Sequence, residues 1–347
     1  MMEKSVLPKL ALTAAILLGT LASPGASPAA VGPWVKNEQA RVRLVGAGNE
    51  LGLEFELAAG WHVYWKNPGD AGYAPRLDFS ATPALRNATL LFPAPHRIDL
   101  PGGLVSYGYE THVLYPVAVE LAAGGDPVIP VTARLDYLVC SDQCIPYTAT
   151  LELSLPRSPR AADGESARLL AAARSALPVE LAKLEGAPVV TLSVRSARAS
   201  AGGRTERTLE VLVAGGSLHA AAVEIFFESH PLFTLDRPVM TAGREGLRFR
   251  VPLHVLNETR PLPAATTFAW TLTGFETPVP AGADGAAATA GTDGTLAITG
   301  TAEVDLGASL PAGDTTSVFR GVPRIGLFVV ACVGVALFLL HRFRRPS

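Results

Sequence analysis

The chain has 347 residues, a formal net charge of -2, and charged side chains at only 17% of its positions. Because Lys and Arg form no basic stripe, this composition argues against nucleic acid as a partner. Three cysteines are too few for a disulfide-built scaffold, so the fold must rest on apolar cores, and the length suffices for two domains.

The N-terminus has the order of a secretory leader. Lys4 and Lys9 precede an apolar run over residues 10–21, and small residues with Pro follow up to residue 30. This pattern predicts a signal peptide over residues 1–30, cleaved after Ala29 or Ala30, with an uncleaved anchor as the alternative. The mature chain is then expected in the periplasm, an oxidising compartment where disulfides persist.

Residues 31–156 are expected to form a first domain of short strands. Apolar and polar residues alternate within each segment, and clusters of Pro and Gly separate the segments, which is typical of an immunoglobulin-like β-sandwich. The predicted strands cover residues 41–45, 51–57, 61–65, 88–92, 113–121, 128–139 and 148–155.

Aromatic and histidine side chains of this domain offer no clear ligand set. Trp61, Tyr64 and Trp65 are interpreted as core anchors rather than as a ligand platform, because large aromatics dominate core burial. His62, His96 and His112 are isolated histidines, and we interpret them as surface or hydrogen-bonded residues because their spacing is not that of metal ligands. We therefore expect neither a metal nor a cofactor.

A helical linker is expected over residues 157–186, with its helix at 165–174, followed by a second β-sandwich over 187–305. The second domain contains no cysteine, and we interpret it as a spacer or docking module. Residues 306–321 resemble a flexible stalk in composition. An uncharged apolar run then predicts one transmembrane helix over 322–342, and the arginines after it place the tail, 343–347, in the cytoplasm.

Two of the three cysteines lie close together in residues 135–147. A strand-like run ends at Cys140, Ser141 to Gln143 can form a turn, and Cys144 follows. Cβ atoms facing each other across such a hairpin lie about 4.5–5.5 Å apart, close to the separation of about 3.5–4.5 Å in a disulfide. The stretch therefore predicts a hairpin whose disulfide forms and breaks without unfolding. The third cysteine, Cys332, lies in the C-terminal apolar run and is interpreted as an inert apolar packing residue.

Three motifs stand out in the first domain: Gly60–Asp70, Ser106–Glu110 and Leu138–Pro146. Together they resemble the periplasmic N-terminal region of the DsbD-like thiol:disulfide interchange family, in the branch that includes the copper-sensitivity suppressor ScsB. Residues 100–110 are rich in Gly and are expected to form a loop. The resemblance implies a redox-active pair, Cys140 and Cys144, and a shielding cap in this loop that contains Tyr107 and Tyr109. It also implies thioredoxin-like or disulfide isomerase-like periplasmic partners. Relatives carry a multi-helix membrane domain, so a separate membrane electron donor is expected for this chain.

Other functions stay open at this stage. A periplasmic cysteine pair is often a permanent structural clip, although a clip that closes so short a loop adds little stability. Two soft thiolates also bind Cu(I), which makes copper handling a third hypothesis. Asp136 and Asp142 lie near the thiols, and their charges are expected to raise the thiol pKa values.

Overall fold

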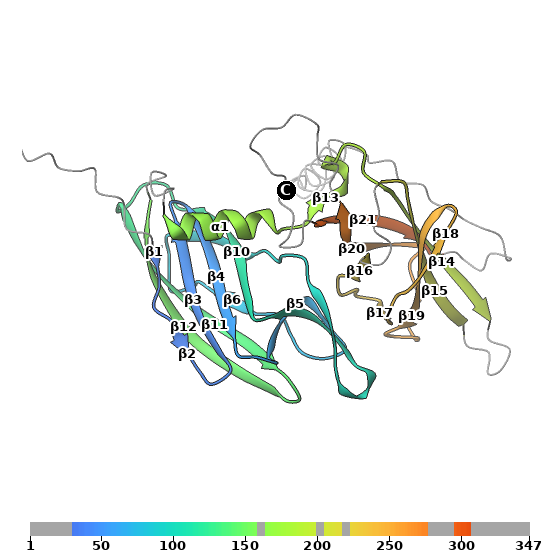
Figure 1. Cartoon of the computed structure of the whole chain (residues 1–347), viewed down its shortest axis with the longest axis horizontal. Helices are drawn as coiled ribbons and strands as arrows, with labels where there is room; N and C mark the ends of the chain where they lie inside the picture. Colours follow the sequence, from blue (N-terminus) through green and yellow to red (C-terminus); the bar gives the residue numbers. More distant parts are fainter. Residues whose placement is uncertain (1–29, 158–163, 199–204, 217–222, 277–294, 307–347) are drawn as a thin grey trace, which may run out of the picture.

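The computed structural model describes residues 30–157, 164–198, 205–216, 223–276 and 295–306, which form two β-sandwiches and one α-helix (Figure 1). The predicted β class is confirmed. The first sandwich and its helix comprise β1 (Ala30–Val31), β2 (Val35–Lys36), β3 (Ala40–Ala47), β4 (Glu50–Leu57), β5 (His62–Gly69), β6 (Arg76–Asp78), β7 (Leu85–Leu90), β8 (His96–Asp99), a 3-10 turn (Pro101–Gly103), β9 (Val105–Glu110), β10 (His112–Leu121), β11 (Val128–Cys140), β12 (Cys144–Pro156) and α1 (Glu165–Ser175).

The second sandwich follows the helix. Its elements are β13 (Val179–Glu180), a 3-10 turn (Leu181–Lys183), β14 (Val189–Arg198), β15 (Thr205–Ala214), β16 (Glu224–Phe227), β17 (Phe233–Leu235), β18 (Val239–Gly243), β19 (Gly246–Val255), β20 (Ala265–Glu276) and β21 (Thr295–Asp305). One sheet has the order β13-β21-β20-β16, and the other has β14-β15-β19-β17 with β18 on β19. Buried aliphatic and aromatic side chains fill the space between the two sheets.

Two six-stranded sheets form the first sandwich. One has the order β1-β3-β4-β10-β7 with β2 on β3, and the other has β12-β11-β5-β9-β8 with β6 on β11. Alternate residues of each strand point inward, as the period of two in the sequence predicts. On β4, for example, Leu51, Leu53 and Phe55 belong to the buried core between the sheets.

Strands β11 and β12 form the predicted cysteine hairpin. They pair residue for residue, from Val128 opposite Pro156 to Cys140 opposite Cys144. The inward residues of β11 have odd numbers, such as Leu135 and Val139. Even-numbered residues, Cys140 among them, therefore face the opposite side of this sheet.

Helix α1 covers part of the outer face of the first sheet (Figure 1). Leu170 and Ala173 pack on Val45 and Leu114, and Arg174 Nε lies 2.9 Å from Glu50 Oε1. The segment after the helix is held by the second sandwich, because β13 pairs with β21 in parallel. The predicted linker therefore contains a helix that packs as part of the first domain.

The second sandwich docks on the first through β16. Phe226 is 2% exposed and belongs to the core of the first sandwich, where its ring meets Trp65 and Tyr107 at centroid distances of 6.1 and 5.2 Å. Polar contacts surround this aromatic contact: Lys66 pairs with Glu228, Arg97 Nη1 lies 3.2 Å from Glu224 Oε1, and Asn67 Nδ2 donates to Phe227 O at 2.8 Å. The second domain is therefore packed against the strands that carry the first-domain motifs.

The terminal segments lie outside this description. The predicted leader lies beyond the described residues except for Ala30, and the predicted stalk, transmembrane helix and tail lie beyond them except for Leu306. Among the described residues, no helix is both long enough and apolar enough to cross a membrane.

We predict that Phe226→Ala loosens both sandwiches. Removing a buried phenyl ring should lower the free energy of unfolding by about 3–5 kcal/mol and should raise hydrogen exchange in β5 and β9 as well as in β16. Phe227→Ala is the matched control, because Phe227 lies in the core of the second sandwich alone. Hydrogen-exchange mass spectrometry should show no change in β5 and β9 for that variant. Unchanged exchange of β5 and β9 in Phe226→Ala would contradict the docking contact.

Candidate functional site

The two cysteines form a disulfide at the tip of the β11–β12 hairpin. Their Cα atoms are 4.2 Å apart, and Ser141 N donates to Gln143 O across the turn at 3.1 Å. The two ends of the bond differ in exposure, since Cys140 is fully buried while Cys144 is exposed. Cys144 is therefore the cysteine that an attacking thiol can reach from solvent.

Tyr64 covers the buried end of the disulfide. It lies between the core residues Val63 and Trp65, so its side chain points to the opposite face of the sheet. There its hydroxyl donates to Cys140 Sγ at 2.7 Å and lies 3.5 Å from Cys144 Sγ. Burial raises the pKa of Tyr64, an effect that the Ser106 hydroxyl partly offsets. The phenol therefore stays protonated at neutral pH and remains a donor to sulfur.

The segment after β5 holds this tyrosine in place. Gly72 has a φ of 104°, and a Cβ atom at this position would lie 2.3 Å from Tyr64 Cζ, so the backbone passes directly over the ring. Asp70 fixes the segment to β9, because its Oδ2 accepts from Val105 N at 2.7 Å. Tyr73 packs against the cluster formed by Tyr64, Leu138 and Cys140. This segment and Tyr64 together shield Cys140.

The structure corrects the expectation that Tyr107 and Tyr109 cap the cysteines. Both residues lie on β9 rather than in a loop, and their side chains belong to the inner side of the sandwich. Tyr109 is buried and donates to Pro93 O at 2.7 Å, whereas Tyr107 packs on Phe226 of the second sandwich. The Gly-rich composition suggested a loop, but Gly108 is needed within the strand, where a Cβ would lie 2.1 Å from Val63 O.

The three histidines have three different environments. His96 is exposed, and His112 Nε2 lies 3.0 Å from Glu54 Oε1. His62 departs from the expectation, since it is 2% exposed and its Nε2 has no hydrogen-bond partner. Neither His62 nor Tyr64 was singled out from the sequence as a site residue. The sequence feature that could have pointed to them is their separation by two positions, because residues two apart on a strand share one face.

The hairpin is braced near its tip by the loop after β2. The rings of Tyr137 and Tyr147 stack with centroids 5.6 Å apart. Asn37 Nδ2 donates to Tyr137 Oη at 2.8 Å, and Tyr147 Oη donates to Gln39 Oε1 at 2.6 Å. Burial raises the pKa of Tyr137 to about 12. These contacts fix the strands from which the two cysteines project.

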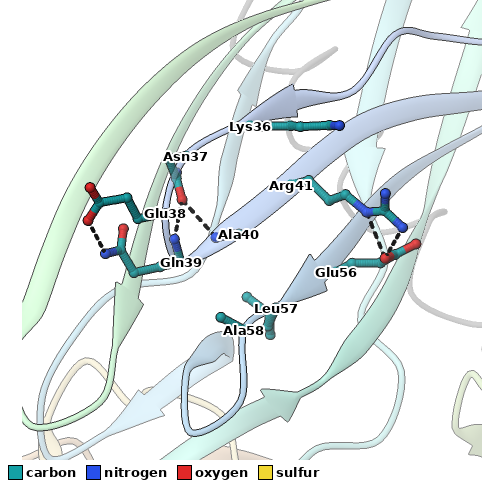
Figure 2. Close-up of a pocket in the computed structure, with 9 residues that line it drawn as sticks. All are labelled: Lys36, Asn37, Glu38, Gln39, Ala40, Arg41, Glu56, Leu57 and Ala58. Atoms are coloured by element: carbon teal, nitrogen blue, oxygen red, sulfur yellow. Dashed lines mark hydrogen bonds and ion pairs between the residues drawn. The ribbon is translucent and has the colours of Figure 1, made fainter.

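A hollow of about 250 Å³ lies beside the same loop (Figure 2). Several of its polar groups already bind one another: Asn37 Oδ1 accepts from the backbone amides of Gln39 and Ala40, and Arg41 pairs with Glu56. Neither cysteine lines it. Over the described part of the chain, no group of three or more His, Cys, Asp or Glu residues has a metal-binding arrangement.

Comparison with known proteins identifies a similar family and a similar fold. Residues 32–156 match the family model for the N-terminal region of the thiol:disulfide interchange protein DsbD. The first sandwich is therefore similar to the N-terminal region of DsbD. The crystal structure of the N-terminal periplasmic domain of ScsB from Proteus mirabilis matches 80% of this chain and 100% of its own, with a TM-score of 0.59 and 18% identity, which shows a shared fold. No functionally curated protein matches the sequence. Both cysteines lie within the matched residues.

We predict that Tyr64, and not Tyr107, controls access to Cys140. In the reduced protein, Tyr64→Ala should speed alkylation of Cys140 roughly tenfold, which corresponds to about 1.4 kcal/mol of lost protection. Tyr107→Ala is the control, since it removes a ring that packs on the second sandwich. Mass spectrometry of the labelled peptides measures both rates. Equal rates for Tyr64→Ala and the unmodified sequence would refute the assignment of Tyr64 as the cover.

Proposed function

We propose that the chain is a membrane-anchored periplasmic thiol:disulfide interchange protein that exchanges electrons with other redox proteins through Cys140 and Cys144. The observation that carries this proposal is the unequal exposure of the two cysteines in a domain similar to the N-terminal region of DsbD. A buried structural clip needs no exposed sulfur, whereas exchange requires one sulfur that a partner can attack.

The exchange balances in two steps. A partner thiolate attacks Cys144 Sγ, the Cys140–Cys144 bond breaks, and Cys140 Sγ leaves with the electron pair and takes up a proton. The second partner thiol then loses its proton and attacks the partner sulfur of the mixed disulfide, which releases Cys144 as a thiolate that takes up a proton. Two electrons and two protons have then moved from the partner dithiol to this chain, and the reverse direction uses the same steps.

Tyr64 contributes to the first step. Its hydroxyl already donates to Cys140 Sγ in the disulfide. Hydrogen bonds to an ionised acceptor are roughly twice as strong as those between neutral groups, so this bond strengthens when Cys140 leaves as a thiolate. The chain thus holds a donor at the atom where negative charge develops.

The sequence supports the remaining parts of the proposal. The leader-like residues 1–30 direct the chain to the periplasm, and the apolar run 322–342 with its basic tail anchors it in the inner membrane. Partners are thioredoxin-like or disulfide isomerase-like proteins, and a separate membrane protein supplies or accepts the electrons.

Trapping of partners tests this function and the roles of the two sulfurs. With Cys140→Ala, Cys144 attacks a partner disulfide and nothing resolves the product, so a mixed disulfide that dithiothreitol dissolves should accumulate in periplasmic extract. Cys144→Ala should trap little, because Cys140 is buried. The opposite pattern would exchange the two roles. Absence of any complex with either variant, together with a disulfide that resists mild reductant, would favour a structural clip.

A further inference from the structure

His62 is a buried polar residue beside the disulfide that the exchange chemistry above does not use. In the register of the sheet, Cys140 has Cys144 opposite it on β12 and His62 opposite it on β5. Side chains directly opposite each other share one face, with Cβ atoms about 4.5–5.5 Å apart. Cys140 therefore lies between the second cysteine and the imidazole.

The imidazole belongs to the same cluster of contacts as the sulfurs. Its ring makes an edge contact with the ring of Tyr64, with centroids 5.1 Å apart, and the Tyr64 hydroxyl reaches both sulfurs. His62 is buried, with only 2% of its surface exposed, and its Nε2 nevertheless makes no hydrogen bond. An unpaired buried polar atom costs about 1–3 kcal/mol, so the disulfide form carries an unsatisfied group next to the reacting bond.

The surroundings keep this imidazole neutral. Burial lowers the pKa of His62. The groups facing it are Tyr64 on its own strand, Cys140 on β11, and Glu110, which lies opposite on β9 and is exposed to solvent. A neutral imidazole with its proton on Nδ1 presents Nε2 as an acceptor.

We propose that His62 Nε2 accepts a hydrogen bond from the Cys140 thiol when the pair is reduced. This inference rests on the proposed exchange function and assigns one further residue to it. On reduction, Cys140 Sγ gains a hydrogen atom, and His62 gains the donor that it lacks in the disulfide. The dithiol is thereby stabilised relative to the disulfide, so His62 makes the pair a stronger oxidant.

The test is the thiol–disulfide equilibrium of the full chain in glutathione buffers, with Cys332→Ala in the background so that only the pair reacts. Replacing His62 by Phe fills the space but removes the acceptor. We expect the equilibrium constant to move roughly tenfold toward the disulfide, which corresponds to a potential about 30 mV more negative. His62→Gln keeps an acceptor and should return the constant to within about threefold of the unmodified value. His96→Gln, at the exposed histidine of β8, should change nothing.

A spectroscopic measurement on the unmodified His62 removes any dependence on the folding of the variants. The ¹⁵N resonance of His62 Nε2 should move upfield on reduction, as expected for an imidazole nitrogen that accepts a hydrogen bond. An unmoved resonance, or equal shifts in the equilibrium for His62→Phe and His62→Gln, would overturn the inference while leaving the exchange function intact. A disulfide that glutathione never reduces, even in the unmodified pair, would overturn both.

Discussion

The pairing of β11 with β12 on one side and β5 on the other is the constraint on which the site depends. Because side chains alternate along a strand, this register places Cys140, Cys144, His62 and Tyr64 on one face, while Leu135 and Val139 fill the core. A slip of one residue on β11 would turn Cys140 into the core and Val139 outward. The hydrophobic pattern that builds the sandwich therefore also determines the contacts of the disulfide.

Much of this was predictable from the sequence. The alternation of apolar residues located most of the strands, and the Cys-x3-Cys spacing predicted the hairpin. Helix α1 was expected over residues 165–174 and ends one residue later, at Ser175. The identity of the residue that covers the disulfide, Tyr64, was not predictable in the same way. Alternation shows that Tyr64 faces away from Val63 and Trp65, but only the pairing of β5 with β11 shows that this face carries the cysteines. Tyr107 and Tyr109 were misassigned because glycines typical of loops also occur where two strands approach closely.

The relation between the two sandwiches also could not be read from local patterns. Phe226 and Phe227 are consecutive and equally apolar, yet one enters the core of the first sandwich and the other that of the second. The expectation of a spacer or docking module did not specify this contact. Phe226 packs on Tyr107 of β9 and on Trp65 of β5, the strand that also carries Tyr64 and His62. Docking of the second domain thus supports β5, the strand whose Tyr64 covers the disulfide. This support comes from packing on the far face of the strand, since Phe226 packs on Trp65 and Tyr107.

The central claim is that the Cys140–Cys144 bond is made to open and close within a fixed fold. The reduction potential of the pair in the full chain tests this most directly. Structural disulfides have potentials below about −300 mV, whereas exchange proteins lie between about −270 and −120 mV. The account predicts a value in the second range, with the β-sheet signal of the protein unchanged between its oxidised and reduced forms. A potential below about −300 mV, or loss of the β-sheet signal on reduction, would contradict it.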